Sequence, residues 1–324
     1  MSRLRLFHLY FSRYGFYNAI IILYHKIFSK PISKLSITNK IVIFFPNDVT
    51  FYVANCCKFY LSQHGYEVVI INDIPPNGFE NCLHIIIGAP ATKRLPLFYI
   101  PFQVEQYMCH TRWHTDKYLW YFNNFKFPIL DYNQININYF VENKIISNDL
   151  FYAPISYIPD YKSLIGFENA DLNRDIDVLF YGALNARRDK FLKVICETNL
   201  NVKIISYQSN LTVNEIYNYL LRSKIVINIH NWDNNLLETI RLFECLSLGC
   251  LVVSEKSLDI HHYEHLLDVV DFVELMDVEQ MLRRVQYWAC NENERLEKVA
   301  NGIVKLQAQE NIFEKNLLKA VTSY

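Results

Sequence analysis

Short hydrophobic runs alternate along the chain with longer segments whose apolar residues recur at helical spacing. The runs are rich in β-branched and aromatic residues, which is typical of strands buried on both faces of a parallel sheet. We predict strands in the first half at 41–45, 66–72, 83–87, 97–106, 128–133 and 151–158. We predict strands in the second half at 176–181, 202–206, 224–230, 251–253 and 271–275. Strands that alternate with helices in this way indicate an α/β protein with right-handed crossovers.

A polar stretch without a sustained period separates the two series of strands and is interpreted as a linker. A chain of 324 residues also suits two domains of ~150 residues each. The predicted organisation is an amino-terminal segment at 1–35, a first domain at 36–160, a linker at 161–175, a second domain at 176–290 and carboxyl-terminal helices at 291–324.

The segment 224–255 gathers polar residues next to predicted strands. It reads as a strand, a polar loop, a helix, the helix-ending Gly249 and another strand. Open α/β sheets bind ligands at the loops and helix starts that follow parallel strands. The candidate site residues in this segment are Asn228, His230, Glu238, Arg241 and Glu244.

A second candidate region follows the strand at 176–181. Gly182 lets a ligand approach the backbone closely, and the next helix start offers free N–H groups to a phosphate. Arg187 and Arg188 can add charge-assisted hydrogen bonds. Either both arginines bind phosphate, or one of them lies on the surface. A Gly-x-Gly-x-x-Gly fingerprint does not occur here, so a Rossmann dehydrogenase is not supported.

Simple structural roles compete with these assignments. His230 either contacts a ligand or hydrogen-bonds its own loop. Arg241 lies three positions from both Glu238 and Glu244, so an ion pair within the helix is an alternative to ligand binding. Glu255 either closes the floor of a pocket or caps the segment that follows it.

Glu105 follows the predicted strand at 97–106 in the pair Glu105-Gln106. A carboxylate where a strand ends is a candidate general base or a hydrogen-bond acceptor for a substrate hydroxyl. The alternative is an acidic residue that stabilises a helix N-terminus. His110 and His114 have a spacing that suits a metal, but no third ligand stands nearby and we predict no metal site.

Composition excludes some classes of partner and location. The net charge of −1 gives no reason to expect nucleic acid as a partner. The eight cysteines show no Cys-x-x-Cys spacing, which favours a reducing, cytoplasmic compartment. Residues 1–30 are basic and aromatic, so they predict either an amphipathic helix on the inner membrane face or a helix packed on the first domain.

The residues of 224–255 resemble the donor-site helix of GT-B glycosyltransferases, in which a glutamate five positions before a glycine binds ribose. Glu244 matches that glutamate, and Leu236 stands where many retaining members have a second one. The chain is also similar to a group of bacterial and viral glycosyltransferase-like proteins. The shared motifs are Glu105-Gln106, Asp177 to Gly182, Arg187-Arg188, Asn228 to His230, Glu238 with Arg241, and Val252 to Glu255.

The resemblance implies a GT-B fold, in which two Rossmann-like domains face each other across a cleft. The first domain would hold the acceptor, the second the nucleotide-diphosphate sugar, and the carboxyl-terminal helices would pack back towards the first domain. The implied activity is metal-independent glycosyl transfer to a glycan, lipid-linked or other hydroxyl acceptor, as in polysaccharide biosynthesis, with no cofactor. Glu105, His230 and Arg187 would be catalytic. The donor site would consist of Gly182, Arg187, Arg188, Asn228, His230, Glu238, Arg241 and Glu244.

Several alternatives stay open at this point. The transfer could invert or retain the anomeric configuration. The chain could also be a non-catalytic nucleotide-sugar-binding subunit of a glycan-assembly complex, or a GT-B-like sugar-nucleotide epimerase.

Overall fold

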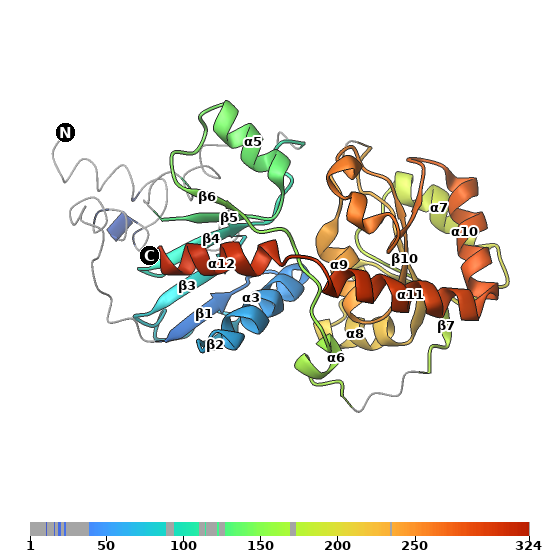
Figure 1. Cartoon of the computed structure of the whole chain (residues 1–324), viewed down its shortest axis with the longest axis horizontal. Coiled ribbons are helices and arrows are strands. Elements are labelled where there is room, and N and C mark those ends of the chain that lie inside the picture. The colour runs from blue at the N-terminus through green and yellow to red at the C-terminus, as the bar shows by residue number, and fades with distance from the viewer. Residues whose placement is uncertain are drawn as a thin grey trace. The chain divides into compact units, whose positions relative to one another are not determined.

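The computed structural model describes residues 39–88, 94–109, 127–168, 173–233 and 235–323, and positions 11, 16, 19, 20, 23, 114 and 122. Most of the predicted amino-terminal segment therefore lies outside the described residues. The chain forms two compact units (Figure 1). The first unit comprises 1–155 and 311–324, and the second comprises 156–310.

The first unit is built on a six-stranded sheet with the order β2-β1-β3-β4-β5-β6. All its neighbouring strands run parallel. The strands are β1 (Lys40–Phe44), β2 (Glu67–Ile71), β3 (Leu83–Ile87), β4 (Tyr99–Gln103), β5 (Ile129–Asp131) and β6 (Leu150–Tyr152). Each begins within one residue of a predicted strand, except β4, which starts two residues later. The predicted strand at 151–158 is wrong after Tyr152, where the chain leaves the sheet.

Helices from separate parts of the chain cover the first sheet. α3 (Phe51–Gln63) follows β1, α5 (Gln134–Glu142) follows β5, and α12 (Ile312–Thr322) comes from the last residues of the chain. α12 packs against α3, β5 and β6, and the Phe313 ring lies against Tyr60 and Phe102. The last helix is therefore part of the first unit's core.

The second unit contains a five-stranded parallel sheet with the order β11-β10-β9-β7-β8. Its strands are β7 (Ile176–Tyr181), β8 (Val202–Ile205), β9 (Ser223–Asn228), β10 (Leu251–Glu255) and β11 (Asp271–Val273). Its helices are α6 (Tyr161–Leu164), α7 (Ala186–Cys196), α8 (Val213–Leu221), α9 (Thr239–Ser247), α10 (Val278–Cys290) and α11 (Glu292–Gln307). Apolar residues of β7, β9 and β10 pack with α7 and α10 in one buried cluster.

Local sequence signals explain where the helices of the second unit begin and end. The side chain of Asn185 accepts a hydrogen bond from the backbone of Arg188 and caps α7. Thr212 and Glu215 form a capping box at the start of α8. Gly249 follows α9 with φ of +72°, a conformation that glycine adopts at little cost.

Two segments are placed differently from the sequence-based domain prediction. Residues 161–175, predicted as a linker, lie in the second unit and include α6. The carboxyl-terminal helices are divided, because α11 belongs to the second unit and α12 to the first.

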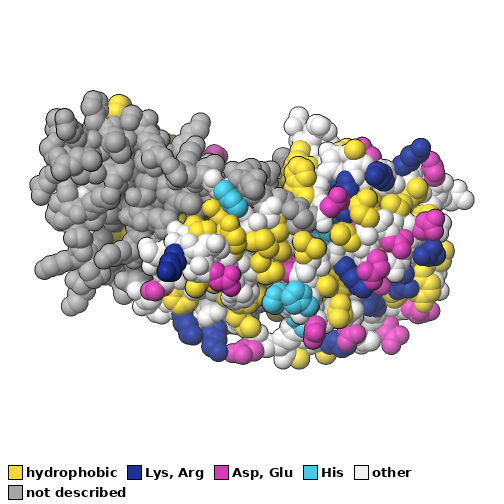
Figure 2. Space-filling model, turned by 90° about the horizontal axis from the view of Figure 1, so that it is seen from above, with side chains coloured by type: hydrophobic (Ala, Val, Ile, Leu, Met, Phe, Trp, Pro, Cys, Tyr) yellow, Lys and Arg dark blue, Asp and Glu magenta, His cyan; other side chains and the backbone are white. Residues whose placement is uncertain are grey.

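The surface carries charges of both signs. In Figure 2, basic and acidic side chains are interspersed over the described part of the visible face. Among the described residues, none of the helices is both long enough and apolar enough to cross a bilayer.

Candidate functional site

The candidate residues of the second unit meet where adjacent parallel strands end. Tyr181 is the last residue of β7, Asn228 the last of β9 and Glu255 the last of β10. These strands are neighbours in the order β10-β9-β7, so their carboxyl ends share one edge of the sheet. Polar side chains from the loop after β9 and from α7 and α9 converge there.

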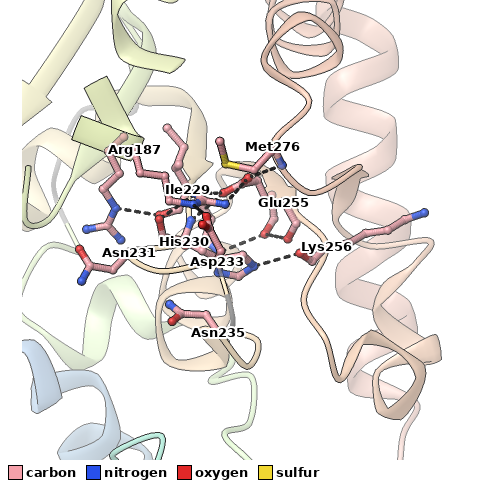
Figure 3. Close-up of polar contacts among 12 residues, drawn as sticks. Arg187, Ile229, His230, Asn231, Asp233, Asn235, Glu255, Lys256 and Met276 are labelled. Atoms are coloured by element: carbon pink, nitrogen blue, oxygen red, sulfur yellow. Dashed lines mark hydrogen bonds and ion pairs between the residues drawn. The ribbon is translucent and has the colours of Figure 1, made fainter. Parts of the chain in front are cut away.

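The Arg187 guanidinium is held by a buried carboxylate (Figure 3). Nη1 and Nη2 of Arg187 donate to the two oxygens of Glu255 at 2.7 and 2.8 Å. Glu255 is 0% exposed and also accepts the backbone N–H groups of His230 and Met276, at 2.8 and 2.9 Å. Each carboxylate oxygen of Glu255 therefore accepts two hydrogen bonds, and all four donors are N–H groups.

Arg187 also contacts the loop after β9. Its Nη1 donates to the His230 carbonyl at 2.9 Å, and its Nε donates to Asp233 at 2.7 Å. Burial on its own lowers the pKa of Arg187, but hydrogen bonds to Glu255 and Asp233 outweigh it and raise that pKa. With all these donors engaged, the guanidinium joins α7, the loop after β9 and the end of β10. Glu255 is thus the centre of this junction. Its side chain bonds His230 and Met276 rather than the segment directly after β10, and its predicted role in closing the floor of a pocket stays a prediction.

Two further guanidinium groups flank Gly182, directly after β7. A Cβ atom on Gly182 would lie 3.3 Å from Arg241 Nη2 and 3.4 Å from Arg188 Nη1. Gly182 has φ of +145°, which other residues rarely adopt. Burial, and then the neighbouring Arg241, lower the pKa of Arg188 to about 10. The backbone angle requires glycine here, and a Cβ atom would in addition sit tightly against the two guanidinium groups.

Glu238 partly balances these two positive charges. Its Oε2 accepts from Arg241 Nη1, and its Oε1 lies 3.5 Å from Arg188 Nη2 and 3.8 Å from His230 Nδ1. Burial raises the pKa of Glu238, but Arg241, His230 and Arg188 outweigh burial and lower it. The predicted pair between Glu238 and Arg241 therefore exists. Glu238 directly precedes α9, which begins at Thr239, and Arg241 lies in the first turn, so the pair spans the start of the helix.

Glu244 has different partners from those expected. The Tyr181 hydroxyl donates to its Oε2 at 2.5 Å, and the Tyr217 hydroxyl donates to its Oε1 at 2.8 Å. Burial, which outweighs these hydrogen bonds, raises the pKa of Glu244. Both tyrosines resemble ordinary core residues in the sequence, so sequence reasoning missed them.

Several buried polar atoms in this region of the second unit have no hydrogen-bond partner among the described residues. They are His230 Nδ1, Asn235 Oδ1, Thr239 Oγ1 and Arg241 Nε. His230 Nε2 contacts the Lys256 carbonyl at 3.2 Å, and Asn228 joins Arg241 to Ser254. Native proteins rarely leave such atoms unsatisfied, so each needs an explanation. Their concentration around the end of β9 marks this region as a candidate ligand site.

A family comparison agrees with this location. Residues 167–314 match the family described as "Glycosyl transferase-like". This part of the chain is a glycosyltransferase domain. It contains all of the predicted donor-site residues, together with Asn235, Thr239 and Glu255. No curated protein matches the chain.

Solved structures show that the GT-B fold extends beyond residues 167–314 to most of the chain. It is similar to a DNA-modifying β-glucosyltransferase studied with and without uridine diphosphoglucose, with a TM-score of 0.53, 15% identity and coverage of 87% of this chain and 99% of that one. The chain is also similar to WaaG, a glycosyltransferase involved in lipopolysaccharide biosynthesis, with a TM-score of 0.50 and 12% identity. This match covers 87% of this chain and 99% of WaaG. HepE from Anabaena, solved with UDP and glucose, has a TM-score of 0.50 and 8% identity to this chain, with coverage of 87% of this chain and 99% of HepE. The predicted fold class is confirmed as two parallel-sheet domains of the GT-B type. The predicted cleft between them stays a prediction.

The remaining candidates lie outside the glycosyltransferase domain. Glu105 belongs to the first unit and is half-buried just after β4. His114 contacts the Tyr107 carbonyl through Nε2 at 3.0 Å, and His110 lies outside the described residues. In the described part of the chain, no three or more His, Cys, Asp or Glu residues are grouped so that they could hold a metal ion.

Proposed function

We propose that the protein transfers a glycosyl group from a nucleotide-diphosphate sugar to a hydroxyl group of a glycan, lipid-linked or other acceptor. The observation that carries this proposal is the pair of guanidinium groups around Gly182. Arg188 and Arg241 approach the same backbone position and share the single carboxylate of Glu238, which leaves an excess of positive charge. This charge lies at the edge of a parallel sheet where phosphorylated ligands bind.

The residues of the second unit divide into two groups in this proposal. Arg241 and His230 face the diphosphate or the sugar, since buried polar atoms of both lack partners there. Arg188 lies beside Arg241 at Gly182 and adds its positive charge, while two of its nitrogens donate to the carbonyls of Ile229 and Ala183. Glu244 accepts hydrogen bonds from the ribose hydroxyls, because each of its oxygens holds one tyrosine and retains a second acceptor position. Arg187 acts through Glu255, and it keeps the His230 loop in place.

The proposed reaction forms one bond and breaks one. The acceptor oxygen bonds to the anomeric carbon, and the bond from that carbon to the diphosphate oxygen breaks. The electron pair of the broken bond stays on the nucleotide diphosphate, where Arg188 and Arg241 stabilise the growing negative charge. In an inverting reaction Glu105 takes the proton of the acceptor hydroxyl. Arginines can neutralise the leaving group in place of a metal, and we propose a metal-independent, cofactor-free enzyme.

Location and acceptor class are part of the same proposal. All eight cysteines are free thiols, which suits a cytoplasmic protein. We propose a role in polysaccharide biosynthesis, with residues 1–30 making peripheral contact with the inner membrane face. Deleting these residues should release the folded protein from anionic liposomes, and retention of the truncated protein would remove the membrane contact.

Ligand-induced stabilisation tests the donor site directly. A nucleotide diphosphate at 100 times its dissociation constant should raise the free energy of unfolding by ~2.7 kcal/mol. Arg241→Lys keeps the charge but removes the planar donor fork, so it should weaken diphosphate binding about tenfold. The control is Arg222→Lys, because Arg222 pairs with Asp175 on the surface of the same unit.

Product analysis then separates the possible activities. Incubation with a sugar nucleotide and an acceptor should yield free nucleotide diphosphate and a glycosylated product. An epimer of the donor would identify an epimerase. Binding without any turnover, including slow donor hydrolysis, would identify a binding subunit.

A further inference from the structure

A second polar cluster lies in the first unit, at the carboxyl ends of β4 and β5. It consists of Gln103, Asp131 and Asn136, and each of these residues is at most 1% exposed. Gln103 and Asp131 are paired in register on neighbouring strands, and Asn136 lies in α5. Burying three polar side chains is costly unless their hydrogen bonds are made, so their partners show what the cluster holds.

The cluster holds the backbone of the turn that follows β4. Gln103 Oε1 accepts the N–H of Glu105, and Gln103 Nε2 donates to the carbonyl of Glu105 at 2.7 Å. Asn136 Nδ2 donates to the same carbonyl at 2.8 Å, while its Oδ1 accepts the N–H of Met108 at 3.2 Å. The backbone that carries the Glu105 side chain is therefore bonded on both its N–H and its carbonyl side.

Asp131 determines how these amides are oriented. Its Oδ2 accepts from Gln103 Nε2 at 3.0 Å, and its Oδ1 accepts from the Asn133 N–H at 2.8 Å and Asn136 Nδ2 at 3.4 Å. Burial raises the pKa of Asp131, whereas all of these contacts are donors and fit an ionised carboxylate. If Gln103 turned over, its N–H₂ group would face the N–H of Glu105 and the turn would lose its support.

We propose that Asp131, acting through Gln103 and Asn136, is a positioning residue that aims Glu105 at the acceptor hydroxyl. This inference rests on the proposed function, in which Glu105 takes the acceptor proton. A general base must lie within hydrogen-bond reach of the proton that it removes. A fixed backbone in the turn after β4, a central strand of the sheet, provides that precision, and Asp131 supplies it without contacting the substrate.

The substitution Asp131→Asn tests the proposal with minimal change of shape. The new amide oxygen can still accept from Asn133 and Asn136, but its N–H₂ group then faces the N–H₂ group of Gln103. Misplacement of Glu105 should lower kcat about 10–100-fold. Donor affinity should stay unchanged, because the donor residues belong to the second unit. An equal loss of donor affinity and kcat would indicate general structural damage and would overturn the proposal.

A double-mutant cycle distinguishes positioning from an independent effect. Glu105→Gln removes the base, so adding Asp131→Asn to it should change kcat by less than about twofold if both act through one group. Independent effects that multiply in the double mutant would contradict the proposal. The pH profile of kcat is a second readout, because the limb due to the Glu105 base should be absent in both Glu105→Gln proteins.

Asn136→Ala keeps the proposal testable if Asp131→Asn fails to fold. It removes one of the two side-chain donors to the Glu105 carbonyl and the Asn136 oxygen that accepts the Met108 N–H, so kcat should fall while donor affinity is kept. The control is Asn138→Ala on the exposed face of the same helix, which should have no effect. The rate of backbone amide hydrogen exchange in residues 103–108 supplies a readout that does not depend on enzyme activity. Faster exchange in Asn136→Ala than in Asn138→Ala supports the clamp, and equal exchange overturns it.

The failure of this inference differs from failure of the proposed function. If the wild-type protein neither binds nor turns over sugar nucleotides, the proposed function is wrong, whatever the exchange data show. If the wild type is active and these variants keep its kcat, only the positioning role of Asp131 is wrong.

Discussion

Replacing Glu255 with glutamine should destabilise the second unit strongly, although the two side chains have nearly the same shape. All four partners of the carboxylate are N–H donors, from Arg187, His230 and Met276. A glutamine can turn its oxygen towards only one pair of donors. Its N–H₂ group then faces the other pair, and none of those groups can accept a hydrogen bond.

The size of the effect follows from burial. Glu255 is 0% exposed and the Arg187 side chain 10% exposed, so water cannot replace the lost contacts. Breaking a buried ion pair by removing one partner costs about 3–5 kcal/mol. At ~2–4 °C per kcal/mol for a domain of this size, the melting temperature of the second unit should fall by roughly 6–20 °C.

Glu244→Gln provides a matched control in the same unit. Its partners are the hydroxyls of Tyr181 and Tyr217, which can rotate and accept a hydrogen bond instead of donating one. The same substitution should therefore cost less than about 1.5 kcal/mol at this position. The two variants differ in whether the partners of the new amide can reverse their hydrogen bonds.

Urea unfolding followed by circular dichroism measures both changes. Hydrogen exchange of peptides from β9 and β10 assigns the loss to the second unit, because a protein of two units need not unfold in one step. A loss below about 1 kcal/mol in Glu255→Gln, or an equal loss in Glu244→Gln, would refute the idea that donor geometry sets the cost.

Three further predictions use other parts of the molecule. Glu244→Gln should weaken binding of a ribonucleotide diphosphate but hardly affect its 2′,3′-dideoxy analogue in calorimetry; equal weakening of both would remove the ribose assignment. Burial lowers the pKa of His84 to about 4, so stability should fall as the pH drops from 6.5 towards 4, because only the unfolded state gains a proton there. A pKa difference of about 2.5 corresponds to about 3 kcal/mol. Urea unfolding between pH 6.5 and 4 should therefore show that the free energy of unfolding decreases by about 3 kcal/mol less in His84→Leu than in the wild type. Turnover should persist in EDTA, since Arg188 and Arg241 can neutralise the leaving group, and a full loss that manganese restores would overturn the metal-free mechanism.

The sequence was sufficient to predict elements whose signals are local. The strand at 224–230 was visible because β-branched residues dominate it, and the end of the helix at 237–248 because Gly249 follows. Both predictions are confirmed within two residues by β9 and α9. Local patterns also placed Gly182, Arg188 and Arg241 in one site, since the carboxyl ends of parallel strands share an edge.

The partners of buried charges could not be predicted in the same way. Arg187 and Glu255 lie 68 positions apart, and no periodicity connects them. Their pairing depends on β9 lying between β7 and β10, which fixes where the loop after β9 passes. Tyr181 and Tyr217 escaped prediction because their apolar rings suit a core, whereas their hydroxyls hold Glu244.

The place of α12 in the first unit has a consequence for biosynthesis. β1 to β6 are synthesised before the second unit, but the helix that packs on β5 and β6 is made only after it. At ~5–20 residues per second, residues 156–310 take roughly 8–30 s to synthesise. Throughout this interval the surface that later receives Phe313 stays uncovered. The second unit, which is continuous in sequence, can complete its fold before the first. A nascent chain is therefore most open to chaperones on the half of the protein that was translated first.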